Sequence, residues 1–349
     1  MRGTVFRGPY QVELRDLPVP RVRDARDAVV RVTASAICGT DLHPYRGELP
    51  EFDVGTVLGH EFVGVVEEAG DEVAHLVGQR VVASDLVACG RCRMCRLGWH
   101  YQCHEATLFG YSTVVGRSID GGQADYVTVP FADVVLTPCP DELTDEQALF
   151  AGDVLATGYI AAERAQIPLG GTVAVIGAGT VGLLAGMCAQ ARGAAAVVIA
   201  DPSPARRAAA ARCGFSAASP EQLAATIADA SSGRGAQSVI EAVGSDAALR
   251  LAVESTAPRG TIVAVGAHHS DAAPLDAGRA FGRELTLRFA VGDPIAVWDE
   301  VFALVRAGRV DPTTVISHRL PLAEVECGYQ LFDRKEATKV VLVCGDVAG

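Results

Sequence analysis

The sequence predicts an α/β protein of two domains, one an antiparallel and partly barrel-like β domain and the other a doubly wound parallel sheet. Three observations lead to this. The chain has 349 residues, which is more than one hydrophobic core usually serves. Short β-branched runs separated by turn signals fill the first 150 residues. Beyond them, strand-like and helix-like runs alternate, as they do in parallel sheets.

Composition narrows the class of protein. A hydrophobic content of 49% with 21% charged residues is typical of a globular chain. The formal net charge of −12 argues against nucleic acid or an anionic membrane as a partner. Met1–Tyr10 has no apolar run behind its arginines, so we expect no secretory signal and a cytoplasmic location. In that reducing compartment the ten cysteines are not expected to form five disulfides.

The first domain is expected to consist mainly of short strands. They are predicted at residues 3–6, 28–32, 62–66, 80–83 and 124–129.

Four cysteines of this domain are closely spaced. Cys89, Cys92, Cys95 and Cys103 follow one another at intervals that let four thiolates reach one tetrahedral ion. Protein ligands would fill every position of such a site, which makes its role structural. The alternatives are four independent buried cysteines, or a site in which His100 or His104 replaces a thiolate.

A second group of candidate ligands opens the central part of this domain. Cys38 is followed by Thr40, Asp41 and His43, and His60 precedes Glu61. A thiolate, an imidazole and a carboxylate, with a hydroxyl and a second imidazole nearby, suit a catalytic zinc with a proton path. The alternative is an ordinary buried cysteine and a core histidine.

A glycine-rich turn marks the start of the second domain's sheet. The run 172–176 leads into Gly177, Gly179 and Gly182, and a second apolar run ends at Asp201, nineteen residues after the last glycine. This is the context of a dinucleotide-binding βαβ unit, whose helix N-terminus holds the pyrophosphate. A carboxylate at Asp201 favours NAD, because it accepts from the ribose hydroxyls and repels a 2′-phosphate. Arg206 and Arg207 follow closely and either soften this preference or are solvated helix residues.

The rest of the chain continues the alternation and then returns to the first domain. Helices are expected at 145–151, 154–164, 204–213, 246–255 and 295–307, and strands at 196–200, 238–241, 261–265 and 285–287. Four aromatic residues are expected in the core: Phe281, Phe289, Trp298 and Phe302. The five scattered cysteines are expected to be small buried apolar residues: Cys139, Cys188, Cys213, Cys327 and Cys344.

Together these motifs resemble the zinc-dependent medium-chain alcohol dehydrogenase superfamily over essentially the whole chain. The segments Gly59–Gly64, Gly121–Val127 and Gly152–Tyr159 are similar to its recurring phrases, most closely those of the bacterial group related to formaldehyde and threonine or polyol dehydrogenases. The resemblance implies a GroES-like antiparallel β-barrel catalytic domain at 1–153 and 291–349, with a structural zinc lobe at 89–103. It implies a doubly wound Rossmann cofactor domain at 154–290.

The resemblance also implies roles for individual residues. Cys38, His60 and Asp153 would bind the catalytic zinc, although many relatives have a cysteine where this chain has Asp153. Glu61 would be an alternative ligand, Asp41 would orient His60, and Thr40 and His43 would relay the proton, with a cofactor ribose hydroxyl between them. The implied cofactor-binding residues are Thr157, Gly177, Gly179, Thr180, Val181, Gly182, Asp201, Arg206, Val243 and Lys339, the last reaching the pyrophosphate.

We therefore expect an oxidoreductase with two zinc ions per chain that transfers a hydride between an alcohol, or the corresponding carbonyl, and NAD. Oxidation or dismutation of formaldehyde or its thiol adducts is an alternative in the same class, and a non-catalytic nucleotide-binding protein is an alternative from another class. Relatives suggest a homodimer or homotetramer. Pocket candidates are largely apolar and would suit an apolar or aromatic alcohol, but each is equally a core residue: Tyr45, Leu49, Phe109, Tyr111 and Leu155.

Overall fold

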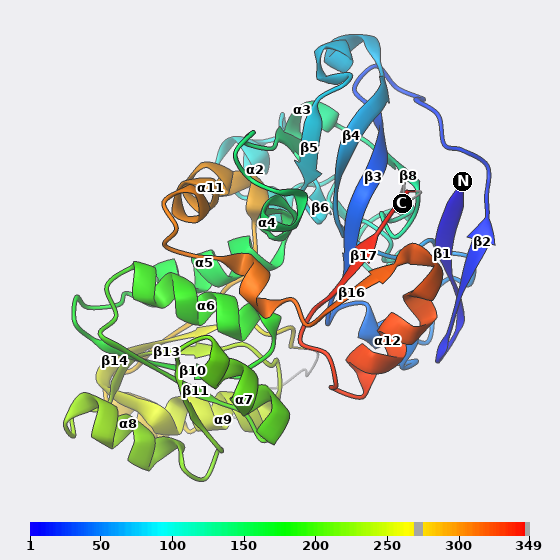
Figure 1. Ribbon diagram of the computed structural model, residues 1–349. Helices are drawn as coiled ribbons and strands as arrows, with labels where there is room; N and C mark the ends of the chain where they lie inside the picture. Colours follow the sequence, from blue (N-terminus) through cyan, green and yellow to red (C-terminus); the bar gives the residue numbers. More distant parts are fainter. Residues whose placement is uncertain (269–274, 346–349) are drawn as a thin grey trace. The chain divides into compact units, whose positions relative to one another are not determined.

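A computed structural model describes residues 1–268 and 275–345, which form two compact units (Figure 1). Unit 1 contains Met1–Asp153, Asp293–Phe302 and Ile316–Gly349, and unit 2 contains Val154–Gly292 and Ala303–Val315. Within the described residues, no helix combines the length and apolar character that crossing a membrane requires.

Unit 1 is built on a seven-stranded, mostly antiparallel sheet. Its path is β16-β17-β3-β4-β5-β9, and β8 pairs with β3. The strands are β3 (Ala28–Ile37), β4 (Glu61–Ala69), β5 (Arg80–Ala83), β8 (Tyr126–Val129), β9 (Leu136–Pro138), β16 (His318–Pro321) and β17 (Val340–Val343). The first half of β3 pairs with β8 and its second half with β17, so β3 is central. β-Branched and small apolar side chains suit such a strand, and eight of its ten residues are buried.

Smaller elements complete unit 1. They are β1 (Arg2–Gly8), β2 (Gln11–Asp16), α1 (Leu42–Tyr45), η1 (Asp71–Leu76), β6 (Leu86–Val87), α2 (Arg93–Arg96), η2 (His100–Gln102), β7 (Thr107–Leu108), α3 (Ala132–Val135), α4 (Asp145–Leu149), η3 (Phe150–Gly152), η4 (Pro294–Ala296), α11 (Trp298–Arg306, which continues into unit 2), η6 (Leu322–Glu324) and α12 (Val325–Asp333). Helix α12 places Tyr329 and Phe332 in the core of the unit.

Unit 2 is a six-stranded parallel sheet in the order β12-β11-β10-β13-β14-β15. The strands are β10 (Thr172–Ile176), β11 (Ala196–Ala200), β12 (Ser216–Ala218), β13 (Ala236–Glu241), β14 (Thr256–Ala264) and β15 (Thr286–Phe289). Every residue of β10 is buried, as a central strand covered on both faces requires. The strand order reverses between β10 and β13, the position at which doubly wound sheets bind nucleotides.

Unit 2 also contains helices, most of which connect these strands. They are α5 (Val154–Arg164), α6 (Thr180–Ala191), α7 (Pro204–Arg212), α8 (Leu223–Ser231), α9 (Asp246–Ser255), α10 (Ala277–Gly282) and η5 (Pro312–Val315). Local signals explain their starts: Ser203 caps α7 by accepting from the Arg206 N–H, with Pro204 in the first turn.

Three expectations about the fold need correction. Residues 303–315 belong to unit 2 and not to the first domain, because Arg309 donates to the Ala191 carbonyl and Thr314 approaches Met187. The helix expected at 295–307 is two elements, η4 and α11, because Asp293 caps the first turn separately. The second domain's sheet also contains β12, which the sequence reading missed.

Burial corrects two of the expected core aromatics and two of the scattered cysteines, of which Cys213 is only half-buried. Trp298 and Phe302 are buried, but Phe281 is 89% and Phe289 57% exposed. Both lie at the edge of the unit 2 sheet, in α10 and β15, where no further strand among the described residues covers them. Cys327 is exposed because it occupies the outer face of α12.

Candidate metal centre and cofactor site

Strand pairing brings the two halves of the first ligand group together. Ala36 of β3 is the register partner of Glu61, which begins β4. The end of β3, followed by Cys38, therefore lies next to the start of β4, preceded by His60. Gly59 has φ +99°, and a β-carbon there would lie 2.4 Å from Gln123, so this turn requires glycine.

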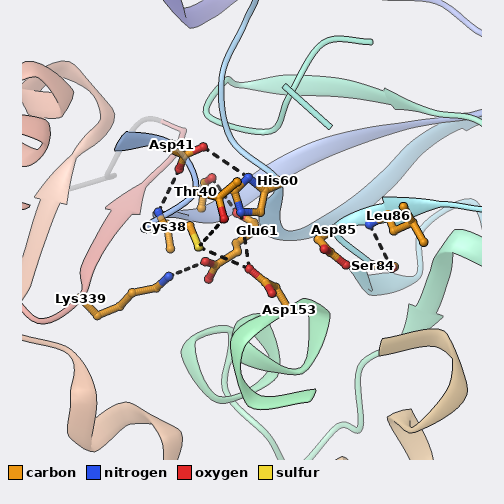
Figure 2. Close-up of polar contacts among 12 residues, drawn as sticks. Cys38, Thr40, Asp41, His60, Glu61, Ser84, Asp85, Leu86, Asp153 and Lys339 are labelled. Carbon is orange, nitrogen blue, oxygen red and sulfur yellow. Dashed lines mark hydrogen bonds and ion pairs between the residues drawn. The ribbon is translucent and has the colours of Figure 1, made fainter. Parts of the chain in front are cut away.

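Four donor side chains converge at this point (Figure 2). One ligand atom each from Cys38, His60, Glu61 and Asp153 lies within 4.8 Å of the others. The Cys38 Sγ is 3.6 Å and the His60 Nε2 3.5 Å from the Asp153 Oδ2. Tetrahedral ligands at zinc distances are separated by roughly 3.3–3.8 Å, so these spacings fit one ion.

The buried Glu61 carboxylate supports the same conclusion. Its Oε2 has no hydrogen-bond partner among the described residues, although Glu61 is fully buried. An unsatisfied buried carboxylate oxygen is costly. A divalent cation held by the neighbouring ligands would remove that cost.

A chain of buried polar groups holds His60 from behind. The Asp41 Oδ1 lies 3.3 Å from the His60 Nδ1. The Asp41 Oδ2 accepts from the Cys38 N–H at 2.9 Å and from the Gln123 Nε2 at 3.3 Å. The Tyr329 hydroxyl donates in turn to the Gln123 Oε1 at 3.0 Å. Sequence reasoning found Asp41 but missed Gln123 and Tyr329, which come from a loop and a helix far away in the chain.

The groups around the His60 ring carry mostly negative charge. Burial alone would lower the pKa of His60, but the charges of Asp41 and Cys38 raise it well above its usual value. Burial raises the pKa of Cys38 to about 11, with Asp153 and Glu61 adding to the effect. The same concentration of negative charge attracts a divalent cation.

Lys339, the residue expected to reach the pyrophosphate, pairs with a candidate metal ligand. It immediately precedes β17, which pairs with β3, and its ammonium donates to the Glu61 Oε1. Both side chains are fully buried. A buried ammonium needs a charged partner, and Glu61 provides it; contact of Lys339 with the cofactor pyrophosphate stays a prediction.

The two relay candidates make different contacts: Thr40 precedes α1, and His43 is part of it. The Thr40 Oγ1 is 3.9 Å from the Cys38 Sγ, beside the ligand group. The His43 ring lies against the Glu48 carboxylate, whose side chain is 46% exposed. Thr40 thus lies beside the ligand group, while His43 pairs with a half-exposed carboxylate.

A further carboxylate, missed by sequence reasoning, lies beside the ligand group. Asp85 follows β5, and its backbone N–H donates to the Gly152 carbonyl at 2.9 Å. Burial raises the pKa of Asp85 well above its usual value, and the Asp153 charge raises it further. The available signal was the polar pair Ser84-Asp85 directly after an apolar strand.

The four cysteines of the lobe also meet. The Cys92 Sγ lies 3.5 Å from that of Cys95 and 3.9 Å from that of Cys103, and the Cys89 and Cys95 sulfurs are 4.0 Å apart. Backbone N–H groups donate to the sulfurs of Cys89, Cys92 and Cys103, which favours thiolates. The set fits a tetrahedral ion bound by four sulfurs.

The two histidines near the lobe are not in this group. The His100 Nδ1 lies 2.9 Å from the Asp293 Oδ1 in a buried pair, and His104 is exposed beside Glu105.

In unit 2 the glycine-rich turn forms an anion cradle. Gly177 follows β10 with φ +103°, and a β-carbon on Gly182 would lie 1.9 Å from the Gly177 carbonyl oxygen. The space beside Gly179 is open, with no atom within 4 Å of a β-carbon placed there. Thr180 and Val181 form the first turn of α6, whose N–H groups point toward this space. The turn fits a dinucleotide pyrophosphate.

Asp201 ends β11 next to the cradle. Its carboxylate accepts from the Ala178 and Ser203 N–H groups at 3.0 and 2.8 Å. The Arg206 Nη1 lies 3.8 Å from it, while the buried Nε of Arg206 has no hydrogen-bond partner among the described residues. Arg207 donates to the carbonyls of Asp201 and Pro202. Neither arginine is simply solvated, which corrects one of the two readings.

The remaining cofactor candidates are more scattered. Val243 follows β13 and is 52% exposed, and its side chain would lie 2.7 Å from a β-carbon on Gly177. Thr157 lies in α5 against Gly292.

Comparisons with known proteins agree with this geometry. Residues 24–141 match the alcohol dehydrogenase GroES-like domain, and residues 180–307 match the zinc-binding dehydrogenase family. A probable zinc-binding alcohol dehydrogenase of Mycobacterium tuberculosis is 40% identical over 94% of this chain and 84% of its own length. The structure of an alcohol dehydrogenase from Thermus sp. ATN1 is 39% identical, covers 99% of this chain and 100% of its own, and has a TM-score of 0.94.

Two further solved structures contain nicotinamide cofactors. A short chain alcohol dehydrogenase of Escherichia coli CFT073 is complexed with NADH; it is 26% identical, covers 98% of this chain and 99% of its own, and has a TM-score of 0.86. A putative zinc-binding dehydrogenase of Sinorhizobium meliloti 1021 is bound to NADP; it is 27% identical, covers 98% of each chain, and has a TM-score of 0.85. With its GroES-like and Rossmann units, this chain belongs to the zinc-dependent medium-chain alcohol dehydrogenase superfamily and is a zinc-dependent alcohol oxidoreductase.

Proposed function

We propose that the protein transfers a hydride between an alcohol and NAD at a zinc ion bound by Cys38, His60 and Asp153. The observation that carries the proposal is the convergence of four donor atoms, with an unsatisfied Glu61 oxygen among them. Glu61 is an alternative ligand, held in reach by Lys339. A second, structural zinc belongs to Cys89, Cys92, Cys95 and Cys103.

Residues around that centre have separate roles. A bound zinc ion would supply Lewis acidity at the substrate oxygen. Asp41 fixes the orientation of the His60 ring, so that Nε2 faces the other ligands. The Thr40 hydroxyl, beside Cys38, would take up the substrate proton, and the His43 ring, paired with Glu48, would pass a proton to solvent.

For the cofactor we propose NAD over NADP. Asp201 is a carboxylate at the end of β11, where it would accept from the ribose hydroxyls and repel a 2′-phosphate. Arg206 opposes this preference, because its Nε, which has no partner in the part of the chain that the structure describes, offers a donor nearby. Relatives bind NADH in one case and NADP in another, so the local residues carry the argument.

Steady-state kinetics with both cofactors on a panel of alcohols and carbonyls tests the proposal. We expect kcat/KM to be at least about tenfold higher with NAD, which corresponds to about 1.4 kcal/mol. An Asp201→Ala variant should lose most of the preference and Arg206→Ala should sharpen it. Turnover with NADP alone would contradict the assignment.

We also propose a homodimer or homotetramer. In unit 2 the last strand of the sheet, β15, has a free edge among the described residues, and Phe281 and Phe289 are exposed near it. Unpaired sheet edges and exposed phenylalanines favour association with another chain. Light scattering of the wild type and of a Phe281→Glu, Phe289→Glu variant tests this, and a wild-type monomer would contradict it.

We propose a cytoplasmic location. All ten cysteines are free thiols, and the two ligand sets need their sulfurs reduced, as the cytoplasm keeps them.

A further inference from the structure

Asp85 is held beside a proposed metal ligand by backbone contacts on both sides. Its N–H donates to the Gly152 carbonyl at 2.9 Å, and its carbonyl accepts from the Phe109 N–H at 3.2 Å. Gly152 precedes Asp153, and a β-carbon on Gly152 would lie 2.1 Å from the Ala83 carbonyl oxygen. The end of β5 and the segment before Asp153 are therefore in direct contact, which fixes Asp85 at the edge of the metal site (Figure 2).

The Asp85 side chain is poorly compensated for a buried acid. The residue is 8% exposed. Among the residues the structure describes, no cationic side chain forms an ion pair with it, and its partners are neutral: the Ser84 hydroxyl at a long 3.4 Å and the Leu86 N–H. A buried carboxylate that has only neutral partners is costly. The apolar residues otherwise expected around the substrate, Phe109 and Tyr111 among them, pack in the core of unit 1.

A phenol lies near the same acid. Burial raises the pKa of Tyr101, and the charges of Asp85 and Asp153 raise it further. Tyr101 is only partly buried and comes from η2, at the end of the cysteine lobe. Tyr101 is thus close enough to Asp85 and Asp153 to feel both charges.

We propose that Asp85 is a specificity-determining residue that accepts a hydrogen bond from a second donor on the substrate, a hydroxyl or an ammonium group near the reacting carbinol. The preferred substrates are then diols, polyols or amino alcohols, not plain apolar alcohols. This assignment rests on the proposed function. A site built to pair with a polar substrate group discriminates against the analogue that lacks it, because the buried protein group is then left unpaired.

Three substrates with one carbon skeleton test the assignment: butan-2-ol, butane-2,3-diol and 3-aminobutan-2-ol. For the zinc-loaded wild type we expect kcat/KM to be roughly 10–100-fold higher for the diol or the amino alcohol than for butan-2-ol, the range of one hydrogen bond to a charged group. Asp85→Leu should abolish this difference and leave butan-2-ol within about threefold, since no bond to it is lost. The diol and amino alcohol arms distinguish the two donors.

Two further variants separate a loss of the substrate hydrogen bond from a general effect on folding. Asp85→Asn keeps the shape and a neutral acceptor, so it should lower kcat/KM for the preferred substrate by roughly fivefold or more and spare butan-2-ol. Asp27→Asn is the matched control. Asp27 is also buried, but it precedes β3, and the ten residues of that strand, about 33 Å, separate it from the metal site. The Asp27→Asn substitution should leave kcat/KM unchanged for all three substrates.

Two results would overturn the assignment of Asp85 but leave the proposed function standing. One is a wild type that oxidises butan-2-ol as well as the diol and the amino alcohol, and the other is an Asp85 variant that loses activity equally on all three. A wild type that oxidises none of them with either nicotinamide cofactor would overturn the proposed function and this assignment with it.

Discussion

At the scale of single residues, the candidate metal centre depends on side chains that are not themselves metal ligands. Gln123 and Tyr329 hold Asp41, which holds the His60 ring. Because the Gln123 amide donates to Asp41, it fixes which oxygen faces the imidazole. Outer partners of this kind typically change metal affinity 10–100-fold when removed.

We therefore expect Gln123→Leu to weaken the catalytic zinc by about tenfold and Tyr329→Phe to weaken it less. Chelator competition measures this, with the four-cysteine zinc as an internal reference. Gln79→Leu is the matched control, because the Gln79 side-chain amide donates to the His75 carbonyl at the surface, away from the ligand group. An unchanged zinc affinity in Gln123→Leu would contradict the claim that the Gln123 hydrogen bond is needed to orient Asp41.

Buried thiols predict a sensitivity to alkaline pH. Burial in α6 raises the pKa of Cys188 from 9.0 to about 12. The folded state thus holds this proton more tightly than the unfolded state. The resulting stability is fully present below pH 9 and is lost as the pH rises from 9 toward 12.

The free energy of unfolding in urea should therefore fall between pH 9 and 10.5, and less steeply in Cys188→Ala, by up to about 1.4 kcal/mol per pH unit. Cys327→Ala, at an exposed position, should retain the wild-type slope. Equal slopes in all three proteins would contradict the burial argument.

At the scale of elements, the close contact of α6 with β10 forms the cofactor cradle. Both Gly182 and Gly186 lie in α6, but a β-carbon meets different neighbours at the two positions. At Gly182 it would lie 1.9 Å from a backbone carbonyl oxygen, and at Gly186 it would lie 3.0 Å from the Phe215 ring. A side chain can move away more easily than a backbone can.

Gly182→Ala should therefore raise the Kd for NADH by about tenfold or more, or destabilise unit 2 by about 1–3 kcal/mol. Gly186→Ala should have a smaller effect on both. Fluorescence titration with NADH and urea unfolding measure the two quantities. A Gly182→Ala protein that is as stable as Gly186→Ala and binds NADH as tightly would contradict the close-packing argument.

At the scale of the whole molecule, the fold class followed from patterns that are local in sequence. The GxGxxG turn between two apolar runs and the four closely spaced cysteines contain their own structural context. The contact of Lys339 has no such local context. Its partner Glu61 is 278 residues away in the sequence, and only the pairing of β17 with β3 brings the two residues together. The pairing of Lys339 with Glu61 could not be predicted from the sequence for that reason.

Burial was also partly hidden from the sequence. Trp298 and Phe281 have similar apolar character, yet one packs inside unit 1 and the other is exposed in α10. Which of them is covered depends on where the sheet ends. Asp85 was missed because a single acid after a strand has no spacing pattern, and its meaning came only from the Gly152 contact.

The most direct measurement is zinc content and turnover in the wild type and in His60→Ala, with NADH binding followed in parallel. We predict two zinc ions per chain in the wild type and one in the variant, whose turnover is lost while NADH still binds to unit 2. One zinc in the wild type, or undiminished turnover in His60→Ala, would contradict the claim that Cys38, His60 and Asp153 hold a catalytic metal.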